Sequence, residues 1–272
     1  MNRIDRKLSD CLAANKKILS PYITAGDPYP ELTVPLMHKL VVAGADILEI
    51  GIPFSDPMAE GPVIQEAMER SLLFNISCED VFAMVNEFRK QDKDTPVILM
   101  GYLNPIEQYG YLKFSQRAKE VGVDGTIIVD LPPEESAIIS PIWQAAELYS
   151  IYLCSPTTTD ERMALINANA KGYLYFVSLK GVTGSSDFDC EKIKTLYQYR
   201  KTQTHLPLMV GFGIKTAQMA ADVAQFADGV IVGAALVGRI FEANTAKNDP
   251  LEAGASLIKE MRLAMDYINP CI

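Results

Sequence analysis

The chain has 272 residues, of which 49% are hydrophobic, and its formal net charge is −9. This length and composition can bury a large core, so we expect one domain over residues 1–272. The acidic charge argues against nucleic acid and anionic membranes as partners. The five cysteines include no C-x-x-C pair, which argues against a disulfide framework and a metal site and fits the reducing cytoplasm. No apolar window is long enough to span a membrane, and the N-terminus lacks an apolar signal region, so a soluble protein is expected.

Short hydrophobic runs alternate with helical patterns along the whole chain. A short amphipathic helix over residues 4–16 precedes the first run. The predicted strands begin near residues 18, 46, 96, 125, 151, 173, 206 and 229. Helices are predicted at 32–41, 61–73 and 79–91, from a loop at 101–105 to about 121, from a loop at 130–135 to about 149, and at 160–170, 190–200, 216–225, 235–244 and 250–267.

Eight strand–helix units predict the fold. The runs show no clear alternation of polar and apolar residues, which is typical of parallel strands buried on both faces. We therefore expect a single (β/α)8 TIM barrel with an extra N-terminal helix. The alternative is a doubly wound open sheet, which usually carries a G-x-G-x-x-G turn after an early strand, and the sequence contains no such turn.

The stretch from 46 to 62 carries an unusual carboxylate. Glu49 interrupts the apolar run 47–52, and the Gly- and Pro-rich loop that follows holds Asp56 and Glu60. A buried carboxylate without a partner is costly, or its pKa rises until it is neutral near pH 7, and that property suits an acid/base catalyst. The alternative is a structural glutamate paired with Lys or Arg and followed by an ordinary acidic loop.

Small residues follow the sixth, seventh and eighth predicted strands, at 178–186, 211–215 and 233–235. Active sites of such barrels lie at the C-terminal ends of the strands, and phosphate groups bind where small residues expose backbone N–H groups at a helix N-terminus. One such loop alone could be a tight turn, but three together predict a phosphate site. His38 and His205 are expected at the surface, without a catalytic role.

Four motifs carry a resemblance to a known family. They are Leu48-Glu-Ile-Gly-Ile-Pro-Phe-Ser-Asp-Pro57, Val182-Thr-Gly184, Gly211-Phe-Gly-Ile214 and Ala227-Asp-Gly-Val-Ile-Val-Gly233. With these in order, the chain closely resembles the tryptophan synthase alpha subunit over nearly its whole length. The resemblance implies a lyase of tryptophan biosynthesis that cleaves indole-3-glycerol phosphate to indole and glyceraldehyde 3-phosphate by a retro-aldol reaction. It also implies no cofactor in this chain and an alpha2-beta2 heterotetramer with a pyridoxal-phosphate-dependent beta subunit.

The resemblance also implies roles for individual residues. Glu49 matches the acid/base residue of the family, and Glu60 matches its second catalytic carboxylate. The residues implied in substrate binding are Tyr22, Met100, Tyr175, Thr183, Gly184, Phe212, Gly213, Gly233, Ala234 and Ala235. The residues implied to face the beta subunit are Asp56, Pro57, Asn104 and Pro105. From the residues alone, Tyr175 could equally be a core residue of an apolar strand.

The chain departs from the family pattern at three places. Glu60 replaces Asp, Ala234 replaces Ser, and Leu179-Lys180 replaces Arg-Ala. The extra methylene of Glu60 moves its carboxylate by roughly 1 Å, and Ala234 removes a hydroxyl contact worth about 0.5–1.5 kcal/mol. An alternative is therefore a catalytically weak alpha-type subunit that acts mainly as an allosteric activator of the beta subunit. Another phosphate-binding barrel, such as indole-3-glycerol phosphate synthase or a sugar-phosphate isomerase, would need a catalytic Lys or paired Asp at the strand ends, where the early strands supply Glu49.

Overall fold

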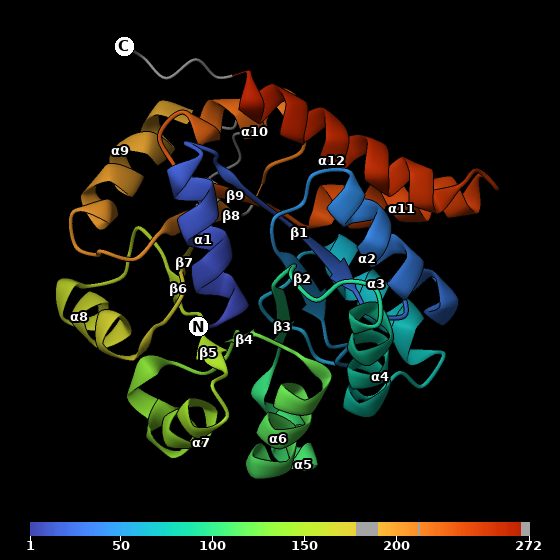
Figure 1. Ribbon diagram of the computed structural model, residues 1–272, viewed down its shortest axis with the longest axis horizontal. Coiled ribbons are helices and arrows are strands. Elements are labelled where there is room, and N and C mark those ends of the chain that lie inside the picture. Colours follow the sequence, from blue (N-terminus) through green and yellow to red (C-terminus); the bar gives the residue numbers. More distant parts are fainter. Residues whose placement is uncertain (178–189, 212, 268–272) are drawn as a thin grey trace.

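The computed structural model describes residues 1–177, 190–211 and 213–267. Its strands form one sheet in the order β5-β4-β3-β2-β1-β9-β8-β7-β6, and every neighbouring pair is parallel (Figure 1). The strands are β1 (Ile18–Thr24), β2 (Leu48–Gly51), β3 (Val97–Gly101), β4 (Gly125–Ile128), β5 (Tyr149–Ser150), β6 (Leu153–Cys154), β7 (Leu174–Val177), β8 (Leu208–Gly211) and β9 (Gly229–Val232).

The two outer strands of this order, β5 and β6, together form the fifth strand of the barrel. β6 lies within the strand predicted from near residue 151, whereas β5 lies where a helix was expected to run to about 149, a prediction that is wrong because α7 (Ser140–Ala145) ends earlier. Residues 151 and 152, which lie between them, bond to both neighbouring strands. The Ile151 N–H donates to the Thr126 carbonyl of β4 at 2.9 Å, and the Tyr175 N–H of β7 donates to the Tyr152 carbonyl at 3.0 Å. The sheet therefore closes into a barrel, and all eight predicted strands are present.

Helices surround the barrel close to the predicted positions. They are α1 (Arg3–Ala13), α2 (Thr33–Val42), α3 (Pro62–Leu72), α4 (Cys78–Arg89), α5 (Leu103–Tyr109), α6 (Tyr111–Val121), α7 (Ser140–Ala145), α8 (Asp160–Asn169), α9 (Cys190–Lys201), α10 (Ala217–Ala224), α11 (Ala234–Thr245) and α12 (Pro250–Asp266), with 3-10 turns η1 (Pro30–Leu32) and η2 (Pro133–Ile138). Side-chain caps fix several helix starts, among them Asn2, Ser77, Thr159, Thr216 and Asp249. No helix of the described residues is long and apolar enough to cross a bilayer.

Two further local predictions are wrong. The helix expected to run to about residue 121 is broken at Gly110, whose φ of 91° ends α5 and starts α6. The expected loop at 101–105 is helical from Leu103, so Asn104 and Pro105 belong to α5. Proline is tolerated there because the N–H groups of a first helical turn have no partner within the helix.

Helix α1 lies across the N-terminal opening of the barrel (Figure 1). Its Ile4 is fully buried in the apolar cluster that fills this end of the interior, together with Ile18, Ile47, Ile98 and other strand residues. The larger core lies between the sheet and the surrounding helices. The N-terminal end of the barrel is thus closed, and the C-terminal end is left for a site.

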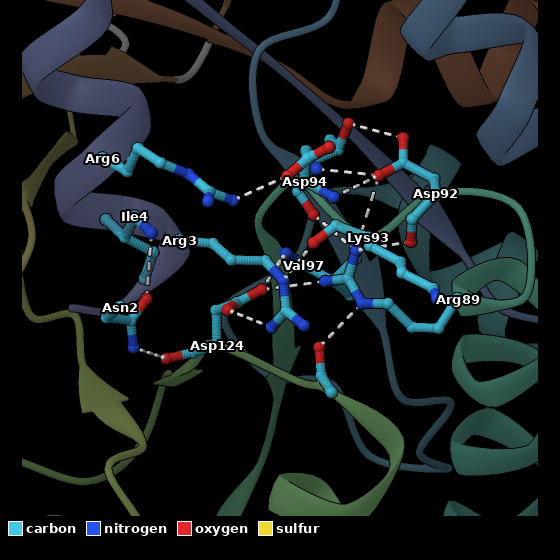
Figure 2. Close-up of polar contacts among 12 residues, drawn as sticks. Asn2, Arg3, Ile4, Arg6, Arg89, Asp92, Lys93, Asp94, Val97 and Asp124 are labelled. Carbon is cyan, nitrogen blue, oxygen red and sulfur yellow. Dashed lines mark hydrogen bonds and ion pairs between the residues drawn. The ribbon is translucent and has the colours of Figure 1, made fainter.

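A buried ion-pair network also belongs to the N-terminal end (Figure 2). Asp124, 2% exposed, lies one residue before β4. It accepts hydrogen bonds from the Arg3 and Arg89 guanidinium groups, both at 2.9 Å, and from the backbone N–H of Val97 at 2.9 Å. A carboxylate with this many partners joins α1, β3 and α4 to one point.

Two further aspartates repeat this arrangement. Asp46 precedes β2 and accepts the N–H of Leu19 at 3.1 Å, and Asp228 precedes β9 and accepts the N–H of Leu208 at 2.8 Å. Each also forms an ion pair with a lysine. In each case an aspartate before one strand accepts a backbone N–H of the neighbouring strand, so three pairs of strands are linked in this way at the closed end.

Candidate active site

Glu49 lies on β2 inside the barrel and is 0% exposed. Its Oε1 accepts hydrogen bonds from the Tyr173 hydroxyl at 2.7 Å and the Ser20 hydroxyl at 3.1 Å. Its Oε2 is buried and has no hydrogen-bond partner among the described residues. Burial raises the pKa of Glu49 to about 7, and the two hydroxyl groups oppose that rise.

The described residues give no support to a structural glutamate paired with Lys or Arg. None of their ion pairs includes the Glu49 carboxylate, and the partners they give it are neutral hydroxyl groups. A glutamate in this state can both bind and release a proton near neutral pH.

Glu60 lies in the loop between β2 and α3 and is partly buried. Its N–H donates to the Pro57 carbonyl at 3.0 Å, and its carbonyl accepts from Gln65 Nε2 at 2.9 Å. Burial raises the pKa of Glu60 to about 7. Two carboxyl groups with perturbed pKa values are a common property of acid/base sites.

Two tyrosines lie within electrostatic reach of both carboxylates, and Tyr22 lies opposite Glu49 on the neighbouring strand. Burial and the charges of Glu49 and Glu60 raise the pKa of the Tyr22 and Tyr175 phenols far above the usual value. The charges of Glu49 and Glu60 thus act on both phenols, and the four side chains share one electrostatic environment.

Glycines at two strand ends make room for these phenols. A Cβ at Gly51 would lie 2.1 Å from the Tyr22 hydroxyl oxygen, and a Cβ at Gly211 would lie 2.2 Å from that of Tyr175. Both distances are far below van der Waals contact, so each ring crosses the backbone where only glycine fits.

The apolar side chain beside these phenols comes from β3. Met100 is partly buried and packs with Tyr22 in one apolar cluster and with Tyr175 in another. Met100 therefore joins Tyr22 and Tyr175, three residues for which the resemblance implies substrate binding. Thr183, Gly184 and Phe212 lie outside the described residues, as does Leu179-Lys180.

The small residues after β8 and β9 lie on adjacent strands. Gly213 has a φ of 81°, with open space where a side chain would be. Gly233 is the residue before α11, and no side chain caps this helix. Ala234 is exposed and Ala235 is partly buried, so the first turn of α11 faces solvent. A helix N-terminus without a side-chain cap attracts a phosphate group.

The residues expected to face a partner differ in exposure. Asp56 and Asn104 are exposed, Pro105 is partly buried, and Pro57 is buried. Asp56 accepts a hydrogen bond from the Ser55 hydroxyl at 2.5 Å. Met58 beside them is a large apolar side chain that is 80% exposed.

Neither histidine joins the site. His205 is exposed, as expected. His38 lies deeper than expected: it is partly buried, its ring centroid lies 4.7 Å from that of Phe88, and its Nε2 has no hydrogen-bond partner among the described residues. Among the described residues, no group of His, Cys, Asp and Glu side chains could hold a metal ion.

Sequence reasoning did not identify Ser20 and Tyr173 as partners of Glu49. In the sequence, both look like ordinary residues of buried strands. Their spacing from predicted site residues could nevertheless have identified them. Ser20 lies two positions before Tyr22, and Tyr173 two positions before Tyr175, so each shares a face with a predicted site residue.

A model of the tryptophan synthase alpha chain family matches residues 8–266. A tryptophan synthase alpha chain from Legionella pneumophila (strain Lens) is 66% identical over 272 residues, 100% of each chain. One from Alkalilimnicola ehrlichii is 50% identical over 266 residues, covering 98% of this chain and 97% of the relative.

Solved structures agree with this finding. The crystal structure of tryptophan synthase subunit alpha from Legionella pneumophila str. Paris has a TM-score of 0.94 and 64% identity, covering 98% of this chain and 100% of the other. A chain of tryptophan synthase from M. tuberculosis, aminoacrylate-bound form, has a TM-score of 0.86 and 30% identity over 97% and 100%. These matches support the TIM barrel and the lyase, and they give no support to a catalytically weak activator or another phosphate-binding barrel. The chain therefore belongs to the tryptophan synthase alpha chain family, and it is a lyase that cleaves indole-3-glycerol phosphate to indole and glyceraldehyde 3-phosphate without a cofactor of its own, pyridoxal phosphate belonging to the beta subunit.

Proposed function

We propose that Glu49 moves the protons of this cleavage. Breaking the bond between indole C3 and the glycerol side chain requires a proton on C3 and loss of a proton from the adjacent hydroxyl group, which becomes the aldehyde. With its Oε1 held by Tyr173 and Ser20, the buried Oε2 is left to exchange the proton with the substrate. This unpartnered oxygen on a carboxylate with a pKa of about 7 is the observation that carries the proposal.

Glu60 is the second carboxylate of the proposed mechanism. Protonation at C3 places positive charge on the indole ring, and an anionic Glu60 facing the indole N–H stabilises that charge. Its influence on Tyr22 and Tyr175 supports this role, because these phenols share one electrostatic environment with Glu49. Tyr22, Met100 and Tyr175 then enclose the indole.

The phosphate group is assigned to the C-terminal ends of the adjacent strands β8 and β9. Backbone N–H groups of Gly213, Gly233, Ala234 and Ala235 are the proposed donors, supported by the uncapped N-terminus of α11. The resemblance adds Thr183, Gly184 and Phe212 to the substrate site. No cationic side chain is needed for this contact, because the helix N-terminus supplies partial positive charge.

A beta subunit is the proposed partner, in a cytoplasmic alpha2-beta2 heterotetramer. Asp56, Pro57, Asn104 and Pro105 are the proposed contact residues, and the exposed Met58 beside them supports this surface. The chain's charge of −9 gives no reason to expect nucleic acid or membrane contacts.

The test of the proposed chemistry is the Glu49→Gln variant. The amide keeps the shape and the hydrogen bonds to Oε1 but cannot take up a proton, so we expect kcat for indole-3-glycerol phosphate to fall by at least about 100-fold. Binding of glycerol 3-phosphate, measured by calorimetry, should stay within about twofold. Retained cleavage by this variant would refute the acid/base role of Glu49.

A further inference from the structure

We propose that Tyr102 is a positioning residue for Glu60, holding the loop between β2 and α3 against the barrel. This inference rests on the role proposed for Glu60 above. It concerns a residue that follows β3 and precedes α5, and that touches the loop at two points.

The first point of contact is a hydrogen bond next to Glu60. The Tyr102 hydroxyl oxygen accepts the backbone N–H of Ala59 at 3.0 Å. Ala59 is the residue immediately before Glu60, so this bond fixes the direction in which the Glu60 side chain leaves the backbone. The second contact is at the start of the loop, where the Phe54 ring lies 5.4 Å from the Tyr102 ring between centroids.

Ile52, at the start of the loop, donates its N–H to the Met100 carbonyl of β3 at 2.8 Å. After Ile52, and apart from the bond to Tyr102, the hydrogen bonds that the described residues give the loop do not connect it to the barrel wall. The Met58 N–H donates to the Asp56 carbonyl at 2.9 Å, and the Glu60 N–H donates to Pro57, so both bonds lie within the loop. Gln65 holds the far end of the loop from α3. Among the described residues, Tyr102 therefore supplies the hydrogen bond that holds the part of the loop next to Glu60 against the neighbouring strand.

The Tyr102 side chain is itself rigid. It is 1% exposed and packs in the apolar cluster that also contains Tyr22, Ile64, Ala67, Met68 and Val237. The N–H of the next residue, Leu103, donates to Asp130 Oδ1 at 2.7 Å. Hydrogen bonds thus connect the loop after β2 to Tyr102 after β3, and Leu103 to Asp130 after β4. A shift of α5 would therefore reach Glu60 through Tyr102.

The hydroxyl group also stays neutral. Burial raises the pKa of Tyr102 to about 12, with smaller contributions from the charges of Glu60 and Asp130. A neutral phenol can accept the Ala59 N–H without adding a negative charge beside Glu60. A carboxylate displaced by about 1 Å can lose about 100-fold in rate, so an anchor for its loop has a direct consequence for turnover.

The test compares two Tyr→Phe variants in the full-length chain with the beta chain present. Tyr102→Phe keeps the ring and removes only the acceptor for Ala59. Tyr197→Phe is the matched control: Tyr197 is 2% exposed, and its hydroxyl accepts a backbone N–H, that of Asp228 at 3.1 Å, at the closed end of the barrel. We expect Tyr102→Phe to lower kcat about tenfold with KM within about twofold, and Tyr197→Phe to leave both unchanged.

The same substitution is then made in a Glu60→Gln background. If Tyr102 acts through Glu60, Tyr102→Phe has no further effect there. An equal loss of kcat in both backgrounds, or an unchanged kcat for Tyr102→Phe alone, overturns the inference while leaving Glu60 in place. If Glu60→Gln keeps the full kcat, the proposed function of Glu60 is wrong, a result distinct from both.

Discussion

The two ends of the barrel bury carboxylates in opposite ways. At the closed end, Asp124 is held by two guanidinium groups and a backbone N–H (Figure 2). At the open end, Glu49 is equally buried but is held by two neutral hydroxyl groups on one oxygen only. Burial raises the pKa of both residues, and for Asp124 it is opposed by the charges of Arg89 and Arg3.

This difference distinguishes carboxylates that hold the fold together from a carboxylate that takes part in the reaction. Breaking a buried ion pair leaves uncompensated charge, so the closed end stabilises the barrel. A buried carboxylate without a cation is destabilising when ionised, and the open end retains one because a proton must move there. Each substitution below tests whether a carboxylate belongs to the first kind or the second.

Asp124→Asn should have the largest effect on stability. It leaves Arg3 and Arg89 without their shared anion, and we expect the free energy of unfolding to fall by about 3–5 kcal/mol. Urea denaturation measures this loss. Below the transition, kcat per folded molecule should be unchanged, and a loss of kcat without a loss of stability would contradict the assignment.

Glu49→Gln should show the reverse. The folded-state pKa of about 7 lies above the usual value of 4.5, so the contribution of Glu49 to stability is fully present below pH 4.5 and is lost as the pH rises to about 7. Because this shift corresponds to about 3 kcal/mol, the Gln variant should be more stable than the native chain by up to that amount above pH 7. The advantage should vanish at about pH 4, and thermal unfolding across this range measures it. Equal stability at pH 8 would show that burial does not strain Glu49.

Gly51→Ala tests the geometry of the open end. The added Cβ would meet the Tyr22 hydroxyl oxygen, so we expect a loss of about 1–3 kcal/mol in unfolding free energy and a lower kcat. Adding Tyr22→Phe removes the colliding oxygen and should restore part of the stability. Gly61→Ala is the control, since nothing lies near its Cβ. An unchanged Gly51→Ala variant would contradict the close approach.

The barrel could be predicted from the sequence, but some helix boundaries and side-chain contacts near its C-terminal opening could not. The eight strands could be predicted because short apolar runs indicate buried strands, and Glu49 could be predicted because a carboxylate is conspicuous within such a run. The helical state of Asn104 could not, because Pro105 usually marks a loop and is tolerated only in the first helical turn. The roles of Ser20 and Tyr173 depend on contacts across the barrel, which no local pattern contains.

Ala234→Ser should have the smallest effect. The residue before α11, Gly233, supplies no side-chain cap, and a hydroxyl at position 234 adds one donor for the substrate phosphate. At about 0.5–1.5 kcal/mol, this contact should lower KM for indole-3-glycerol phosphate by about 2- to 10-fold with kcat unchanged, because it binds substrate and transition state alike. Ala246→Ser, at the other end of the same helix, is the matched control and should leave KM unchanged. Initial-rate kinetics of both variants decide the matter: if Ala234→Ser leaves KM unchanged, or if both variants lower it equally, the phosphate group does not bind at the start of α11.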